Sequence, residues 1–315
     1  MPKDKRKTRT IFYRRVAWID GKANISLETH LKKAHESLQT THDRTFPHAD
    51  GEIQGLIVDP LNEGLFFHLA LYTPHQPTSL VPFPSKAKSK ATSPKPPPEQ
   101  HNYMDGDIFF IVSGNHIVLC PSGARESVAI SYISHSLRKA GKEKVISQFG
   151  IEPVAQVDKV KLIQQEGVKK VALNASLYEA SVEYTERKTT KMNILNGVAE
   201  EIIALFAKDD NPELQSIGDM ENLSVKLEIS FDSRKKGGEL GRKRLDKTAS
   251  MLINDDEDQG FSIVTGSGKK LTADEIRISD KVKLSPHGNS VFRSDAKKAL
   301  ITYLADLKES GMLEQ

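Results

Sequence analysis

Apolar and polar positions in the first half of the chain alternate in short runs that predict strands joined by tight turns. Residues 10–20 combine β-branched and aromatic side chains, a composition typical of a strand. The apolar segments 53–58 and 65–72 flank turn residues and predict a hairpin. Residues 107–120 predict a second hairpin, because two apolar runs flank a Ser-Gly-Asn turn.

Two helices are expected between and after these strands. The first begins near Ser26, a residue suited to the N-cap, and places apolar residues at helical spacing. Its apolar positions are Leu27, Leu31, Ala34 and Leu38. The second spans about 127–140 and stops at Gly141. We therefore expect the N-terminal domain to close near residue 150.

The second half of the chain predicts a further set of strands and helices. The expected strands cover about 169–183, 223–231, 261–264 and 275–284. The expected helices cover about 191–208, a segment after Gly241 and a segment from Ser294 onward. The fold class is therefore α+β, with two domains, 1–150 and 151–315, each a mainly antiparallel sheet with packed helices.

The first domain is interrupted by a stretch rich in proline and lysine. Eight of the fifteen prolines lie between Pro74 and Pro98, together with Lys86, Lys88, Lys90 and Lys95. Such a composition buries too little apolar area to offset its ordering entropy, so we expect a disordered insertion at about 74–102. Its lysines could add to anion binding, although a solvated loop is the simpler interpretation.

Length, composition and cysteine usage limit the classes of protein. A chain of 315 residues with 37% hydrophobic content can form two cores. No apolar run approaches the roughly 18–20 residues of a membrane-spanning helix, and the charged N-terminus does not resemble a secretory signal. The single cysteine, Cys120, excludes an intrachain disulfide and is typical of a reducing compartment. We expect a cytoplasmic protein.

Positive charge is concentrated in two segments, although the formal net charge is only +3. The segment 233–247 carries seven basic side chains, and the first fifteen residues carry another seven against one aspartate. Clusters of this kind are typical of binding to a phosphate backbone, and a solvated surface is the alternative. The residues expected to bind nucleic acid are Arg234, Lys235, Lys236, Arg242, Lys243, Arg244, Lys247, Lys5, Arg6, Lys7 and Arg9.

A helix is expected after Gly241, so that the C-terminal basic cluster is presented from a rigid support and is not only a flexible loop. Leu245, Ala249 and Leu252 would face inward, with Lys243 and Lys247 stacked one turn apart on the outside. The cluster lacks interleaved aromatic residues, and the aromatic residues near the N-terminus fit a strand core better than a stacking platform. Duplex backbone binding is therefore favoured over single-strand binding.

Other candidate chemistries find weaker support. His30, His35, His42 and His48 lack both metal-ligand spacing and cysteine partners, so we expect no metal and no cofactor. The sequence Gly266-Ser267-Gly268-Lys269 is interpreted as a hairpin turn rather than a phosphate loop, and Cys120 as a buried, inert thiol. A nuclease would need clustered carboxylates, for which Glu183, Glu186 and Glu228 are the candidates.

The order of these features resembles the RexA family of phage superinfection-exclusion proteins and, more distantly, the KwaB-like component of the Kiwa antiphage system. The resemblance rests on Phe12-Tyr13-Arg14, on Asn24–Leu27 with Leu31, on the hairpin IFFIVSGNHIVLC and on Gly150–Val154. The insertion at 74–98 departs from the pattern. The resemblance implies cytoplasmic two-domain homodimers that bind DNA with little sequence preference and act with a separate membrane-protein effector. No functional residue of the family maps onto a position here.

We therefore expect a non-enzymatic protein that binds double-stranded DNA without sequence preference. It would act in phage exclusion or antiphage defence, as a sensor for a separate effector. One alternative is a metal-dependent nuclease or toxin effector of a defence system. Another is an adaptor whose basic patches bind an acidic protein.

Overall fold

The computed structural model of this chain describes residues 6–19, 25–49, 51–84, 86, 88–176, 224–232, 238–253 and 260–313. Its contacts define two compact units. The first unit comprises residues 1–151 together with 280–315, and the second comprises residues 152–279. We expected the C-terminal domain to run from 151 to 315, but the last segment returns to the first unit, because its strand and helix complete the sheet and core there. Helices and antiparallel sheets are combined as expected for an α+β protein.

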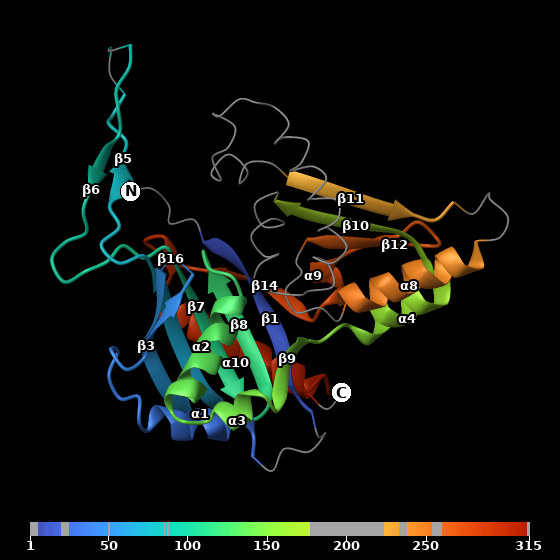
Figure 1. Cartoon of the computed structure of the whole chain (residues 1–315), viewed down its shortest axis with the longest axis horizontal. Helices are drawn as coiled ribbons and strands as arrows, with labels where there is room; N and C mark the ends of the chain where they lie inside the picture. Colours follow the sequence, from blue (N-terminus) through green and yellow to red (C-terminus); the bar gives the residue numbers. More distant parts are fainter. Residues whose placement is uncertain are drawn as a thin grey trace. The chain divides into compact units, whose positions relative to one another are not determined.

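The first unit is built on an eight-stranded sheet with the order β14-β1-β8-β7-β4-β3-β2, in which β9 also pairs with β1. Its strands are β1 (Lys7–Trp18), β2 (Thr45–His48), β3 (Gly51–Leu61), β4 (Gly64–Tyr72), β7 (Gly106–Ser113), β8 (His116–Ser122), β9 (Phe149–Pro153) and β14 (Ser279–Leu284). Both expected hairpins are confirmed, as β3–β4 and β7–β8. Figure 1 shows their arrangement.

The central strands are apolar on both sides because both faces of the sheet are covered. Successive side chains of a strand point to opposite faces, so Phe109 and Phe110 enter different layers. Phe110 stacks on Phe67 at 4.4 Å between ring centroids, and Phe109 stacks on His68 at 4.3 Å. The apolar run of β7 is therefore buried throughout.

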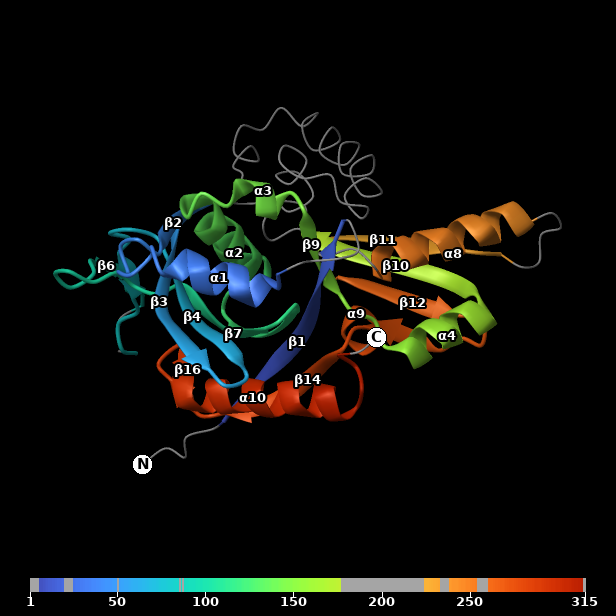
Figure 2. The ribbon, with the colours of Figure 1, turned by 90° about the horizontal axis from the view of Figure 1, so that it is seen from below.

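Helices cover each face of this sheet. The helices of the first unit are α1 (Leu27–His35), α2 (Ser127–Lys139), α3 (Glu143–Ile146) and α10 (Arg293–Glu309). Phe12, Phe67 and Phe110 share one core with α1 and α2, whereas α10 contacts β7 and β8 on the opposite face. Figure 2 shows α1 and α2 on one side of the strands and α10 on the other. The three helices expected in these segments are confirmed.

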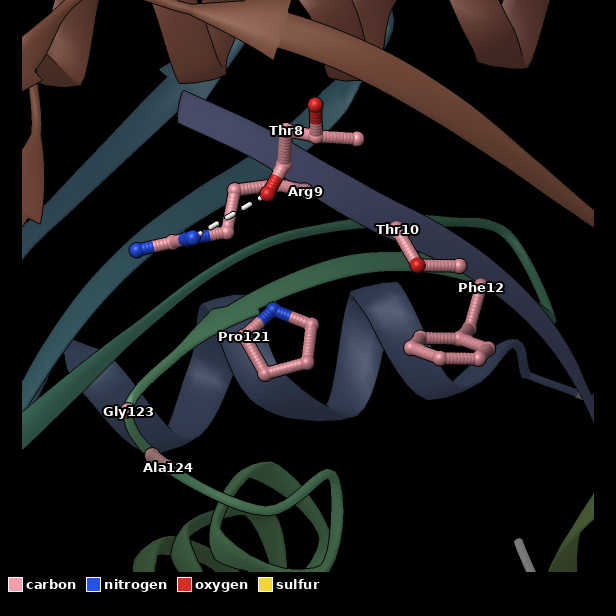
Figure 3. Close-up of a pocket in the computed structure, with 7 residues that line it drawn as sticks. All are labelled: Thr8, Arg9, Thr10, Phe12, Pro121, Gly123 and Ala124. Atoms are coloured by element: carbon pink, nitrogen blue, oxygen red, sulfur yellow. Dashed lines mark hydrogen bonds between the residues drawn. The ribbon is translucent and has the colours of Figure 1, made fainter. Parts of the chain in front are cut away.

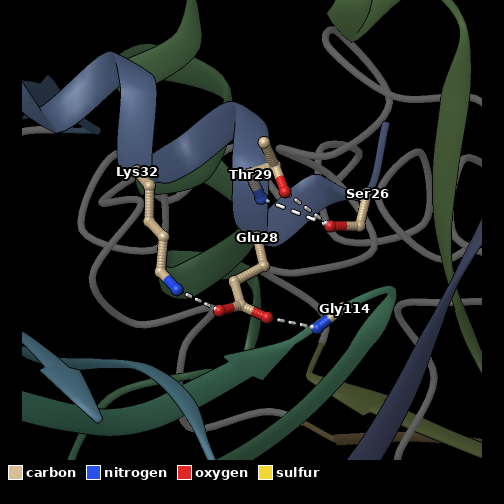
Figure 4. Close-up of polar contacts among 5 residues, drawn as sticks. All are labelled: Ser26, Glu28, Thr29, Lys32 and Gly114. Carbon is tan, nitrogen blue, oxygen red and sulfur yellow. Dashed lines mark hydrogen bonds and ion pairs between the residues drawn. The ribbon is translucent and has the colours of Figure 1, made fainter. Parts of the chain in front are cut away.

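The start of α1 shows how the sequence positions a helix. The Ser26 hydroxyl accepts a hydrogen bond from the Thr29 backbone N–H at 3.3 Å, as expected for an N-cap. Glu28 accepts from the Gly114 backbone N–H at 2.7 Å and pairs with Lys32 at 2.5 Å (Figure 4). Glu28 therefore ties α1 to the turn of the β7–β8 hairpin.

Two short ribbons extend the first unit. Within the stretch expected to be a disordered insertion, β5 (Thr78–Leu80) pairs with β6 (Ser93–Lys95). Near the C-terminus, β15 (Pro286–His287) pairs with β16 (Ser290–Val291). The expected single strand at 275–284 is wrong in its first part, because the chain there ends the short helix α9 (Ala273–Ile276) and strand β14 begins only at Ser279.

The second unit is a four-stranded antiparallel sheet with the order β11-β10-β12-β13, packed against helices. Its strands are β10 (Val168–Ser176), β11 (Ser224–Ser230), β12 (Phe261–Thr265) and β13 (Lys270–Thr272). Its helices are α4 (Val157–Glu166), α8 (Glu239–Ile253) and α9 (Ala273–Ile276). The expected helix at 191–208 and the end of the expected strand at 169–183 lie outside the described residues. The turn at Gly266–Lys269 joins β12 to β13, as expected.

Candidate nucleic-acid interface

Helix α8 carries the described part of the C-terminal basic cluster. Its inner face consists of Leu245, Ala249 and Leu252, which are all buried in the core of the second unit. The side chains of Arg242, Lys243, Arg244 and Lys247 are exposed. The expected helix is confirmed (Figure 1). Its residues Leu245, Ala249 and Leu252 face inward and its basic residues face outward, also as expected.

Two contacts fix α8 to neighbouring elements of its unit, strand β10 and helix α4. Asp246 Oδ1 accepts a hydrogen bond from the Val168 backbone N–H at 2.8 Å, at the start of β10. Arg242 Nη2 donates to the Glu166 carbonyl oxygen at 3.3 Å, at the end of α4. Arg242 thus supports the helix, whereas Lys243, Arg244 and Lys247 project from it. Because the helix backbone is already ordered, the binding of phosphates by these cations costs side-chain entropy but no backbone entropy.

The N-terminal cluster is partly engaged inside the first unit. Arg6 is exposed, but Lys7 Nζ donates to the carbonyl oxygens of Gly288 at 2.9 Å and Ser290 at 3.1 Å. Arg9 Nε donates to Ser122 Oγ at 3.2 Å. Lys7 and Arg9 therefore hold β1 to its neighbours in addition to carrying charge, which the sequence pattern did not reveal.

Arg9 also lines a shallow hollow beside the end of β8. The hollow has a volume of about 310 Å³ and is lined by Thr8, Arg9, Thr10, Phe12, Pro121, Gly123 and Ala124 (Figure 3). The polar side-chain groups of its lining are two threonine hydroxyls and one guanidinium, which suit a single anionic group better than a large apolar ligand.

The remaining predicted site residues lie outside the described part of the chain. They are Lys5, Arg234, Lys235 and Lys236. The described basic residues divide between the two units, with Arg6, Lys7 and Arg9 in the first and α8 in the second. That the N-terminal and C-terminal basic clusters lie on one common surface stays a prediction.

The carboxylates considered for a nuclease do not form a described cluster. Glu183 and Glu186 lie outside the described residues, and Glu228 is held between Lys170 and Lys226 at 3.0 Å each. The hydrogen bond from Lys170 is the main reason that the pKa of Glu228 lies below its ordinary value. Among the described residues, no three histidine, cysteine, aspartate or glutamate side chains gather in a way that could hold a metal ion.

Two polar side chains highlighted by the sequence, Cys120 and His35, are shielded from solvent to different extents in the first unit, since His35 is only half-buried. Cys120 is buried, and desolvation raises the pKa of its thiol to about 12. His35 contacts the Leu31 carbonyl oxygen at 2.9 Å and the Tyr132 hydroxyl at 3.1 Å. Burial lowers the pKa of His35, so its neutral form is favoured.

One arginine of the N-terminal basic segment is no surface cation at all. Arg14 is 1% exposed and pairs with Glu126, also buried, at 2.7 Å. Its neighbour Arg15 remains partly exposed. Sequence reasoning missed this difference, and strand alternation is the only signal that separates the two positions.

No protein-family model, curated protein or solved structure matches this chain. Within the described ranges, no helix is both long and apolar enough to cross a membrane.

Proposed function

We propose that this protein binds double-stranded DNA without sequence preference through the basic face of α8. The observation that carries the proposal is the exposure of Lys243, Arg244 and Lys247 on a helix whose opposite face is anchored in a core. A row of cations on a fixed support follows a phosphate backbone and reads no base edges, so the affinity depends on charge and salt rather than sequence.

The biological setting belongs to the same proposal and rests on the resemblance to the RexA family. In this setting, the protein is a cytoplasmic homodimer of two-domain subunits that detects phage DNA, and a separate membrane-protein effector responds. Arg6, Lys7, Arg9 and the basic residues before α8 would extend the contact. The protein itself would leave the DNA intact.

Reversing two charges on α8 tests the interface. The double variant K243E/K247E should bind duplex DNA roughly 10- to 100-fold more weakly at moderate salt, because two phosphate contacts are replaced by repulsion. The slope of log affinity against log salt should fall by about two, equally for unrelated sequences. Fluorescence anisotropy with several duplexes at a series of salt concentrations measures both quantities.

A matched control separates a site from an effect of net charge. Lys298 and Lys308 are exposed on α10, so K298E/K308E changes the net charge by the same amount on another helix. Equal loss of affinity in both double variants would contradict the assignment to α8. Incubation of the parent protein with plasmid and Mg²⁺ or Mn²⁺ tests the nuclease alternative, since nicked plasmid would contradict a purely binding role.

A further inference from the structure

The insertion between β4 and β7 forms a defined arm, residues 76–96. Its two strands, β5 and β6, pair from Thr78 with Lys95 to Leu80 with Ser93. Figure 1 shows β5 and β6 standing away from the large sheet of the first unit, and every described residue of the arm is exposed. The arm contributes nothing to either core.

Hydrogen bonds hold the base of the arm. The His75 backbone N–H donates to Asn102 Oδ1 at 2.9 Å, and the Tyr103 hydroxyl donates to the Pro96 carbonyl oxygen at 3.3 Å. Thr73 Oγ1 donates to Asp105 Oδ2 at 3.3 Å where the arm joins the sheet. The arm is therefore anchored at both of its ends, although its described residues are exposed along its length.

The tip of the arm presents apolar side chains to solvent. Val81 is 82% exposed and Phe83 is 91% exposed. Pro82 and Pro84 flank Phe83, and proline fixes the backbone φ angle, so the aromatic ring is carried on a stiffened segment. An exposed aromatic residue on a stiff projection is costly in water and is typical of a binding element.

The same arm is uniformly basic. No aspartate or glutamate occurs from Gly64 to Pro98, and the arm contains Lys86, Lys88, Lys90 and Lys95, all exposed. Lys90 Nζ donates to the Phe83 carbonyl oxygen at 3.4 Å, which places an ammonium group at the apolar tip itself. The partner must therefore offer an apolar slot and negative charge within a few ångströms of each other.

A nucleic-acid duplex satisfies both conditions better than a membrane does. Insertion of Phe83 into lipid would draw the Lys90 ammonium toward hydrocarbon, and the backbone of 81–84, which belongs to no helix or strand, would lose its hydrogen bonds to water there. In a duplex, by contrast, phosphates line the groove directly beside the stacked bases, and a single apolar side chain is enough to enter a base step.

We propose that the arm binds the groove of double-stranded DNA, with its lysines on the phosphates and Phe83 wedged between base steps. Partial unstacking by such a wedge kinks the duplex, so this protein bends the DNA that it binds. The inference rests on the proposed DNA binding and adds a second contact, on the first unit, with a distinct structural consequence.

Bending and unstacking are measured directly on the full-length protein. A duplex of about three helical turns carries a fluorophore at each end for energy transfer, and a second duplex carries 2-aminopurine, whose emission rises on unstacking. The parent protein should increase both signals. The F83A variant should lose both increases while its affinity stays within about tenfold of the parent value, because the lysines still contact phosphates.

Two variants serve as controls for the wedge. F83W retains a large ring at the tip and should keep both signals. L80A removes an apolar side chain that is 46% exposed at the end of β5, outside the Pro82–Pro84 segment, and should also keep them. Loss of the signals in L80A as well as in F83A would overturn the assignment of the wedge to Phe83.

The outcomes separate this inference from the proposed function. If the parent protein binds the duplex but F83A bends and unstacks it equally well, Phe83 is not a wedge, whereas the proposed DNA binding is unaffected. If the parent protein does not bind duplex even at low salt, both proposals fail. If F83A instead weakens binding to vesicles of anionic phospholipid and leaves bending unchanged, the arm is a membrane element and the inference is overturned.

Discussion

Arg14 and Lys243 show that basic side chains serve different purposes in this chain. Arg14 is buried on β1 against Glu126, whereas Lys243 projects from α8. A buried ion pair loses hydration on both sides, and its stability depends on both partners being present. The positive charge of Arg14 therefore belongs to the fold rather than to a binding surface.

Removing the charge of Glu126 should destabilise the first unit. E126Q leaves Arg14 charged and buried, so the free energy of unfolding should fall by about 3–5 kcal/mol. Trp18, the single tryptophan, packs against the core of this unit and reports its unfolding in a urea titration. As a control, E63Q changes an exposed turn residue and should alter stability by less than about 0.5 kcal/mol. Equal effects of E126Q and E63Q would contradict a structural ion pair.

At the scale of single elements, the sequence predicts where a helix begins or a strand ends when a capping residue or a turn sequence marks that position. Helix α1 begins directly after Ser26, and β12 turns into β13 at Gly266–Lys269. The arm, residues 76–96, shows the opposite case, because its proline-rich composition predicted disorder and yet β5 pairs with β6. Each strand pairs with a partner about fifteen residues away in the chain, and amino-acid composition carries no information about such a pairing.

The N-cap of α1 provides an element-scale prediction. S26A removes the acceptor for the Thr29 N–H and should lower the free energy of unfolding by about 1 kcal/mol. S26D preserves an N-cap acceptor and should remain near the parent value. Urea titration with Trp18 fluorescence compares the two variants, and an equal loss in both would show that the cap contributes nothing.

At the scale of the whole molecule, the C-terminal segment completes the first unit. Lys7 donates to Gly288 and Ser290, and the Ser290 hydroxyl donates to Asp107 Oδ2 at 2.5 Å. Asp107 Oδ2 also contacts His68 Nε2 at 3.1 Å, so β4, β7, β1 and β16 meet at this point. Helix α10 then covers the sheet face that α1 and α2 leave open.

Truncation after residue 279 should therefore prevent the first unit from folding. The truncation removes the buried apolar side chains of α10, which are Ala296, Leu300, Tyr303, Leu304 and Leu307, and exposes the face of β7 and β8 that α10 covers. Burial of each large apolar side chain contributes about 1.5–3 kcal/mol, so the combined loss is comparable to the entire stability of a typical domain. The cooperative unfolding transition of Trp18 should disappear. Truncation after residue 309 keeps α10 and should preserve it, and a cooperative transition in the shorter chain would contradict this account.

The sequence by itself determined the hairpins, the amphipathic faces of α2, α8 and α10, and the local clusters of charge, because periodicity and turn chemistry act over a few residues. Only the tertiary structure decided that residues 280–315 belong to the first unit, that Arg14 is buried, that Lys7 and Arg9 are engaged, and that β5 and β6 form an arm. These properties depend on contacts between residues far apart in the chain, and pairing free energy between distant segments leaves no periodic signal in the sequence.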